Sequence, residues 1–402
     1  MKPQERPSIF LEFLYRSDRE MLTLSLALFA LVAWILMAHL VFQAQRHLLF
    51  LKDLDPLAPS ACPPLSIIVP ARNEERHVEE AIRSLLNQDY PAIECIVVDD
   101  RSTDQTGAIL ERLTQQDSRL RLLTISSLPQ GWLGKNYALH RGAQIANGAY
   151  LLFTDADVVM HPLTLRKALQ HMIMQDLDYV TIAPQITMRR AALQVVAAIF
   201  GFVLLILFQP WKMRNPKSPC HIGIGAFTLV RTEAYRVLGG HKPIAMRPDD
   251  DLKLSKLFKR RGYRQDLLLG QGMIFVEWYA SLRELIEGLL KNTFAGVDYR
   301  ISLVVLGTLA SFAVHLWPWV GLAVTTGLAQ FLYGLVLLLM LTVVSGILAS
   351  QGINPLWAIG FPAAILLLLY IQWKAMLIAL WSGGITWRGT HYPLKALKAN
   401  KV

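Results

Sequence analysis

The chain has 402 residues, a formal net charge of +10, 53% hydrophobic and only 17% charged residues, and a mean hydropathy of +0.35. Soluble domains carry about 25% charged residues, so part of this chain is expected to lie in lipid. No basic run is interleaved with aromatic residues, so the positive charge favours an anionic membrane surface and argues against nucleic acid as a partner. The three cysteines are scattered and odd in number, which excludes a disulfide framework or a paired-cysteine zinc site.

The first long apolar segment, 21–42, is uncharged over about the 20 residues that cross a hydrocarbon core. It predicts a transmembrane signal anchor after an N-terminal tail, 1–20. A cleaved signal peptide is the alternative, but the segment is long for one and no small-residue cleavage site follows it. C-terminal transmembrane helices are predicted within 302–380, before a basic tail, 381–402. Their apolar runs lie at roughly 302–324, 328–349 and 356–380.

Residues 63–290 carry most of the charge, and an α/β domain is predicted over 63–300. The apolar run Leu65–Pro70 precedes a helical pattern at Glu79–Leu86, and the run Glu94–Asp100 precedes a helix that starts near Ser102. Continuous apolar strands joined by helices are typical of a mostly parallel sheet.

An apolar stretch at 191–209 interrupts this domain. Its length permits a crossing, a re-entrant segment, an interfacial helix or a buried helix. A full crossing would separate two halves of one sheet domain. We therefore expect an interfacial or re-entrant helix.

Polar residues follow the first two predicted strands. Pro70, Arg72, Asn73 and Glu74 stand at the end of the first, and Asp99 and Asp100 at the end of the second. In an open α/β sheet ligands bind at this edge. Helix capping is the alternative interpretation of the acidic group.

The third predicted strand, Tyr150–Phe153, is followed by the D-x-D sequence of Asp155 and Asp157. Residues two apart on an extended strand face the same side. The two carboxylates can therefore converge on a hard divalent cation, Mn²⁺ or Mg²⁺, that also holds a diphosphate.

Lys135 follows Gly131 and Gly134 at a predicted helix start. This sequence resembles a phosphate-binding turn, but the G-x-x-x-x-G-K-[ST] spacing of a P-loop is missing. An ordinary loop and helix start is the alternative.

Three consecutive carboxylates, Asp249 to Asp251, precede a basic helix. Like charges this close repel one another, so the run indicates metal binding, capping or proton transfer. A helix start would hold such a carboxylate ionised, as a general base requires. A cap followed by a solvated charged face is the alternative.

These motifs, in this order over about 63–300, resemble the family-2 glycosyltransferases with a GT-A fold. Within them the chain is similar to membrane lipid glycosyltransferases such as the ceramide glucosyltransferase group and bacterial relatives linked to hopanoids or carotenoids. The resemblance implies a Rossmann-like, mostly parallel GT-A domain with membrane helices at both ends. It implies an inverting transfer from a nucleotide-sugar donor, expected to be a UDP-sugar, to a hydroxyl of a membrane lipid.

The resemblance also implies roles for individual residues. Glu74 and Asp100 would lie near the uracil and ribose, and Asp157 would bind Mn²⁺ or Mg²⁺ with Asp155 near the metal or sugar. Asp251 would be the catalytic base and Asp250 its acidic neighbour. The donor-binding residues expected from the motifs and the resemblance together are Pro70, Arg72, Asn73, Glu74, Asp99, Asp100, Lys135, Asp155, Trp278 and Arg283.

One family motif, Q-x-x-R-W, is absent. Trp278 and Arg283 stand in the corresponding region and are expected to take over diphosphate and acceptor contacts. Processive polysaccharide synthases rely on that motif, so its absence favours a single transfer to a lipid.

Two alternatives are kept: transfer to a polyprenyl phosphate, and a non-catalytic membrane scaffold that retains the fold. Because nucleotide sugars are cytosolic, the expected location is an integral membrane protein, in a bacterial inner membrane, with its catalytic domain facing the cytoplasm. Three crossings after that domain would put the tail outside, whereas Arg388 and three lysines make it cytoplasmic by the positive-inside rule. The tail resembles a motif of the lipid-linked relatives, and an aromatic interfacial anchor is the alternative.

Overall fold

The computed structural model describes residues 9–402, with side chains from Glu20 onward, so part of the predicted tail 1–20 lies outside the described residues. The chain forms two compact units. We call them the helical unit and the sheet unit. The helical unit comprises the chain up to Gln43, Val195–Ile206 and Arg300–Tyr370, and the sheet unit comprises Ala44–Gln194, Leu207–Tyr299 and Ile371–Val402.

The sheet unit is built on one mixed sheet with the strand order β1-β9-β7-β8-β5-β2-β3-β4, and β6 pairs with β9. Strands β5, β2, β3 and β4 are parallel, whereas β8 runs antiparallel to its neighbours β5 and β7. The predicted α/β class is confirmed. The strands are β1 (Leu49–Phe50), β2 (Leu65–Ala71), β3 (Ile93–Asp100), β4 (Leu120–Ile125), β5 (Tyr150–Phe153), β6 (Val158–Met160), β7 (Tyr179–Thr187), β8 (Thr228–Arg231) and β9 (Gln265–Glu277).

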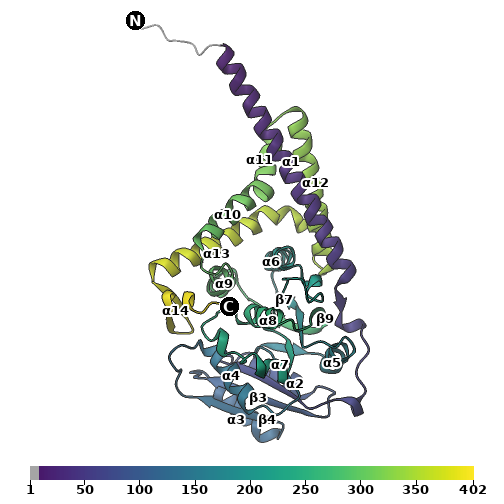
Figure 1. The fold of residues 1–402 in the computed structure, drawn as a ribbon, viewed down its shortest axis with the longest axis vertical. Helices are drawn as coiled ribbons and strands as arrows, with labels where there is room; N and C mark the ends of the chain where they lie inside the picture. Colours follow the sequence, from purple (N-terminus) through teal and green to yellow (C-terminus); the bar gives the residue numbers. More distant parts are fainter. Residues whose placement is uncertain (1–8) are drawn as a thin grey trace. The chain divides into compact units, whose positions relative to one another are not determined.

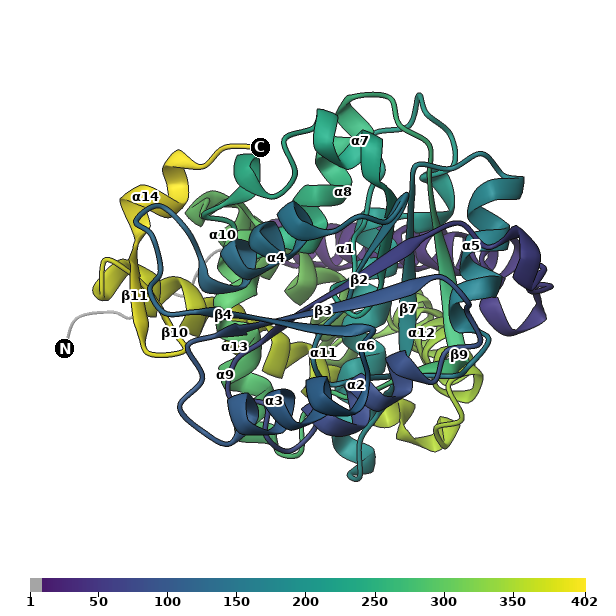
Figure 2. The same cartoon turned by 90° about the horizontal axis from the view of Figure 1, so that it is seen from below.

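Helices cover both faces of the parallel strands, with α4 on one face and α2 and α3 on the other (Figure 2). Ile67 and Val97 share a core cluster with α2 and α3, whereas Ile68 and Val98 face Gly142 of α4. Each of these side chains is fully buried, which stabilises the fold by about 1.5–3 kcal/mol apiece. The helices are α2 (Val78–Leu86), α3 (Thr106–Gln116), α4 (Gly134–Ile145), α5 (Thr164–Met174), α7 (Thr232–Val237), α8 (Asp250–Arg260) and α9 (Leu282–Gly296).

Among the described residues, five helices are long and apolar enough to cross a membrane (Figure 1). The predicted anchor, 21–42, lies inside the first, and the ambiguous stretch 191–209 forms the second. The first predicted C-terminal run is broken by a π-helical turn, Phe312–Leu316. The helices concerned are α1 (Ile9–His47), α6 (Ala191–Phe208), α10 (Ile301–Ser311) with α11 (Trp317–Val324), α12 (Gly327–Ser350) and α13 (Phe361–Trp381).

Trp34 lies at the centre of the helical unit and is fully buried. Its ring stacks on Phe202 with centroids 6.0 Å apart and meets His315 and Phe361 edge-on. Its indole nitrogen donates to the carbonyl of Val314, inside the π-helical turn, at 3.0 Å. An irregular turn in an apolar setting needs such side-chain donors, because lipid offers none.

The predicted tail, 381–402, is folded rather than extended. Strands β10 (Gly384–Trp387) and β11 (Thr390–Pro393) form an antiparallel hairpin, and α14 (Leu394–Ala399) follows. The two turn residues, Arg388 and Gly389, both have positive φ, 49° and 77°. Two such residues make the tight turn whose twist matches paired strands. We call residues 384–393 the tail hairpin.

Candidate active site

The loops that follow β2 and β3 are tied to each other. Asn73 has a left-handed backbone, φ 54°, and its side-chain oxygen accepts from the Thr103 amide at 2.8 Å. The amide of Glu74 donates to the Thr106 hydroxyl, also at 2.8 Å. These contacts hold Asn73 and Glu74 in place. They also explain why α3 begins at Thr106 and not near Ser102 as predicted, because Ser102 accepts from the Asn73 amide within this loop.

Asp100 is the last residue of β3, and its side chain packs against Gly134 at the start of α4. It is buried and forms ion pairs with Arg101 at 2.7 Å and with Arg72 at 3.5 Å. A Cβ at Gly134 would lie 2.2 Å from an oxygen of Asp100, so only glycine permits this approach. Asp99 instead accepts from the Ser102 amide at 3.1 Å, and Pro70 pairs in register with Val98 on β3.

Lys135, the first residue after Gly134 in α4, reaches the D-x-D sequence. Its ammonium lies 2.5 Å from an oxygen of Asp155. Gly225 stands beside this pair, since a Cβ there would lie 2.9 Å from Asp155 and 3.1 Å from the Lys135 ammonium. The Gly225 amide also donates to Asp251 Oδ2 at 3.0 Å. One glycine therefore marks the point where three predicted site residues meet.

The first turn of α8 carries Asp250 and Asp251, both without an ion pair to any residue in the described part of the chain. Burial and the neighbouring charge of Asp250 raise the pKa of Asp251, and Lys135 opposes this shift. Burial likewise raises the pKa of Asp250. A buried carboxylate with this affinity for protons can accept one from a bound hydroxyl.

Asp249 has a different environment. The guanidinium of Arg247 donates two hydrogen bonds of 2.8 Å to its carboxylate, and the ammonium of Lys253 lies 3.4 Å from the same carboxylate. Asp298 contacts both cations at 3.0 Å. This closed network occupies Asp249, so the structure brings only the second and third aspartates of the run to the site.

Asp157 fits a cation. Burial raises its pKa, and the like charges of Asp155 and Glu74 raise it further. Hard carboxylate oxygens and uncompensated negative charge suit Mn²⁺ or Mg²⁺. The described residues contain no cluster of three or more protein ligands. A magnesium-type site on one or two carboxylates needs none, because phosphates of the substrate complete it.

Two cations at this site were not predicted from the sequence. Lys291 of α9 lies near Asp250, Asp155 and Asp251, and burial together with Lys135 lowers its pKa to about 8. Its ammonium stands 3.9 Å from the ring centroid of Trp387 on the tail hairpin. Arg388, the next residue, forms an ion pair with Glu74 at 2.5 Å.

Neither cation has a strong signal in the amino-acid sequence. Lys291 lies on an amphipathic helix, where a lysine usually faces water. Arg388 stands more than 300 residues after Glu74. Only the Trp-Arg-Gly turn pattern of the hairpin could have indicated an ordered tail.

Trp278 and Arg283, which were expected to replace the missing Q-x-x-R-W motif, lie in different environments. Trp278 is partly buried against the sheet core and packs on Tyr279 with ring centroids 4.9 Å apart. Tyr279 lies close enough to the D-x-D for Asp157 and Asp155 to raise its pKa in addition to burial. Arg283 is 86% exposed and pairs with Glu287 at 2.8 Å on the surface of α9. The structure therefore does not bring Arg283 to the other site residues.

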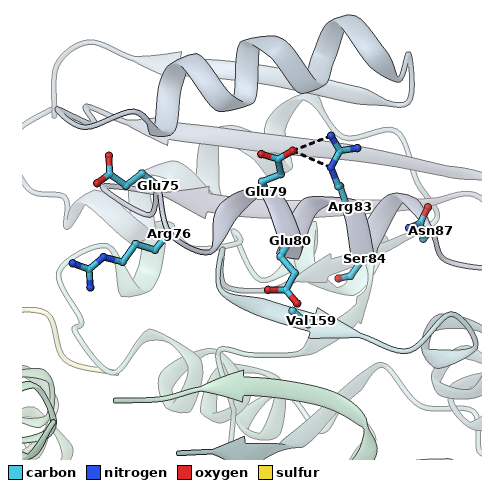
Figure 3. Close-up of a pocket in the computed structure, with 8 residues that line it drawn as sticks. All are labelled: Glu75, Arg76, Glu79, Glu80, Arg83, Ser84, Asn87 and Val159. Atoms are coloured by element: carbon cyan, nitrogen blue, oxygen red, sulfur yellow. Dashed lines mark hydrogen bonds and ion pairs between the residues drawn. The ribbon is translucent and has the colours of Figure 1, made fainter. Parts of the chain in front are cut away.

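A surface depression of about 580 Å³ lies along α2 and β6 (Figure 3). Glu79 and Arg83 form an ion pair on its wall. None of the predicted site residues lines it, so it is separate from the cluster described above. Its lining residues are Glu75, Arg76, Glu79, Glu80, Arg83, Ser84, Asn87 and Val159.

Comparison with known proteins identifies the region that holds the motifs after β2, β3 and β5 and Lys135, but not the aspartates of α8 or the tail hairpin. Residues 66–239 match the model of the Glycosyl transferase family 2. A 4,4'-diaponeurosporenoate glycosyltransferase of Staphylococcus haemolyticus is 26% identical over 259 residues, covering 62% of this chain and 68% of that protein. An uncharacterized glycosyltransferase of Haemophilus influenzae is 32% identical over 115 residues, covering 29% and 34% respectively.

The fold also has a counterpart among solved structures. A mannosyltransferase of Pyrobaculum calidifontis, in complex with GDP-Man and Mn²⁺, superimposes with a TM-score of 0.53 at 19% identity. The match covers 90% of this chain and 99% of that one. At this identity the likeness shows a shared fold.

Proposed function

We propose that this chain, a glycosyltransferase with a family 2 domain, moves a sugar from a nucleotide-sugar donor to a hydroxyl of a membrane lipid. The observation that carries the proposal is the convergence of Asp155, Lys135 and Asp251 around Gly225. This convergence supports the proposal, because the ammonium of Lys135 could neutralise a diphosphate beside a carboxylate suited to act as a base.

Asp251 performs the proton transfer in this mechanism. Its carboxylate takes the proton of the acceptor hydroxyl while the acceptor oxygen attacks the anomeric carbon of the donor. The bond to the diphosphate breaks on the opposite face of the sugar, so the anomeric configuration inverts. The hydrogen bonds from the amides of Gly225 and Leu252 fix the carboxylate in position during this step.

Charge on the departing diphosphate is balanced by the cations that line the site. Lys135 is the cation that pairs with Asp155 of the D-x-D sequence, and Lys291 adds a second positive charge to the site. Asp157 and Asp155 would hold Mn²⁺ or Mg²⁺, which when bound supplies further neutralisation of the leaving group. The Mn²⁺ in the Pyrobaculum structure supports this assignment.

A lipid acceptor is supported by the helices and by the relatives. Five described helices are apolar and long enough to span a membrane, so the enzyme would meet its acceptor where lipid is present. The Staphylococcus haemolyticus relative is named for a carotenoid-type acceptor. As part of the proposal we extend to this chain an apolar lipid acceptor, glycosylated at a hydroxyl and not at a carboxylate, together with a cytoplasmic catalytic unit and a UDP-sugar donor.

The test uses the full chain in nanodiscs with Mn²⁺, radiolabelled uridine diphosphate and guanosine diphosphate sugars, and a bacterial lipid extract. Label should pass into the organic phase with one donor, and the Asp251→Asn variant should lose this transfer. The chemistry of the product then identifies the acceptor. A glycoside of a hydroxyl survives mild acid and mild alkali, whereas a polyprenyl phosphate sugar is cleaved by acid and a glycosyl ester by alkali.

If mild acid cleaves the product, the acceptor is a polyprenyl phosphate and not a lipid hydroxyl. Absence of transfer with every donor, joined to absence of nucleotide binding, would instead indicate a scaffold that retains the fold.

A further inference from the structure

The tail hairpin is attached to the sheet unit at the predicted donor site. Arg388 at its tip pairs with Glu74 and donates to the carbonyl oxygens of Arg72 and Asn73 at the end of β2. Tyr392 is buried, and its hydroxyl accepts from the Gly134 amide at the start of α4, at 3.4 Å. The hairpin therefore touches two of the loops that carry predicted donor-binding residues.

The segment after the hairpin fixes the tail at a third place. The side chain of Asn400 accepts from the Met246 amide at 2.9 Å and donates to the Pro243 carbonyl at 2.8 Å. Lys256 of α8 donates to the carbonyl of Val402 at 2.7 Å. Contacts of the hairpin itself and of the segment after it make the position of the tail part of the fold.

The hairpin brings positive charge to a group of carboxylates. Burial opposes ionisation of Asp155, yet Lys135, Lys291 and Arg388 together hold its pKa below the usual value. Lys291 rests on Trp387 and has no carboxylate at ion-pair distance within the described residues. Such a cation, half-buried near several anions but paired with none of them, is placed to bind a ligand that carries its own negative charge.

We propose that Arg388, held by the tail hairpin, and Lys291, resting on Trp387, bind the diphosphate of the donor. This inference rests on the proposed function, since it assigns two further residues to the same site. Glu74 and the carbonyl oxygens of Arg72 and Asn73 contact the guanidinium. A planar guanidinium matches phosphate oxygens in pairs, so a diphosphate competes well for it.

The experiment compares the binding of uridine, uridine monophosphate and uridine diphosphate, and of the guanosine series, by the full chain with Mn²⁺. The variant is Arg388→Asn, because asparagine tolerates the positive φ of the turn and leaves the hairpin geometry intact. Loss of a charge-assisted contact should weaken diphosphate binding roughly tenfold to hundredfold. Nucleoside binding should change little, and Arg388→Lys should recover part of the loss.

The matched control is Arg112→Asn, which removes another arginine that pairs with a glutamate, Glu79 at 2.5 Å, away from the site. It should leave all affinities unchanged. Equal weakening of nucleoside and diphosphate by Arg388→Asn, or no weakening, would overturn the assignment. If the unmodified chain binds no nucleoside diphosphate of either series, the proposed function itself is contradicted. That result differs from the two Arg388→Asn outcomes, which contradict only the assignment of Arg388.

Discussion

Asp249 and Asp251 are two residues apart and occupy opposite electrostatic environments. Asp249 is neutralised by Arg247 and Lys253 in a closed buried network. Asp251 is half-buried and has only two amide donors, from Gly225 and Leu252. The difference teaches that a run of carboxylates is not one functional group. Partners decide which member supports the fold and which remains available for chemistry.

The largest expected effect comes from removing the available carboxylate. In the Asp251→Asn variant the side chain keeps its shape and its oxygen can still accept a hydrogen bond from the Gly225 amide, but the amide group cannot take a proton from the acceptor. Turnover should fall by roughly 10²–10⁴, the usual contribution of a general base. The measurement is the initial rate of sugar transfer at saturating donor. Near-normal turnover would remove Asp251 from the role of base, and a lowered melting temperature would point to a structural role instead.

The neutralised carboxylate should behave in the opposite way. Asp249→Asn leaves the buried guanidinium of Arg247 with Asp298 as its remaining acidic partner. Breaking a buried ion pair costs about 3–5 kcal/mol, and the retained partner favours the lower end. Thermal unfolding in detergent should show the loss as a lower melting temperature. A variant that is stable yet inactive would contradict the division between the two residues.

The pH dependence of kcat/KM should report the site carboxylate. Burial and Asp250 raise the pKa of Asp251 to about 7, and the base works only when deprotonated. Activity should therefore fall about tenfold per pH unit below 7 and level off above it. Asp250→Asn removes the like charge, so the falling limb should move to lower pH. A profile that stays flat from pH 5 to 8 would exclude a base with this environment.

A smaller effect is expected from Arg247→Lys. Lysine keeps the positive charge but loses the paired hydrogen bonds to Asp249. We expect a loss of about 1–2 kcal/mol in stability, less than for Asp249→Asn, with turnover within about twofold of normal. Loss of turnover at unchanged melting temperature would show that the network and the site are not separate.

Much of the fold could be predicted because its signals are local. The runs that became β2, β3 and β5 are short and apolar, and each ends in polar residues whose type indicates a ligand edge. The helix predicted near Ser102 begins later, because side chains of this loop bind the neighbouring loop instead of capping a helix. The helix propensity of a short segment cannot predict hydrogen bonds to another loop, and these bonds decide where the helix starts.

The candidate site was predicted less completely, for a related reason. Lys135 and Asp155 were found by the motifs that contain them, although nothing in either motif shows that the two form an ion pair. Lys291 and Arg388 belong to no motif of the domain and reach it only through α9 and the tail hairpin. Arg283 was chosen by its place in the chain, but the helix turns it to the surface.

The contacts of the tail hairpin also restrict the path of the chain through the membrane. The sheet unit includes the chain before Arg300 and again from Ile371 onward. A chain that leaves a folded unit on one side of a bilayer and returns to it must cross an even number of times. Three apolar segments lie in this interval, so a sheet unit that lies wholly on one side of a bilayer requires that at least one of them does not cross.

The segment of α10 and α11, with its π-helical turn and Pro318, is the least regular of the three and the best candidate to enter and leave on one side. If the sheet unit lies wholly on one side of a bilayer, α6, which both leaves and rejoins that unit, makes no crossing. Under that condition the positively charged tail and the proposed catalytic residues would share one face of the membrane.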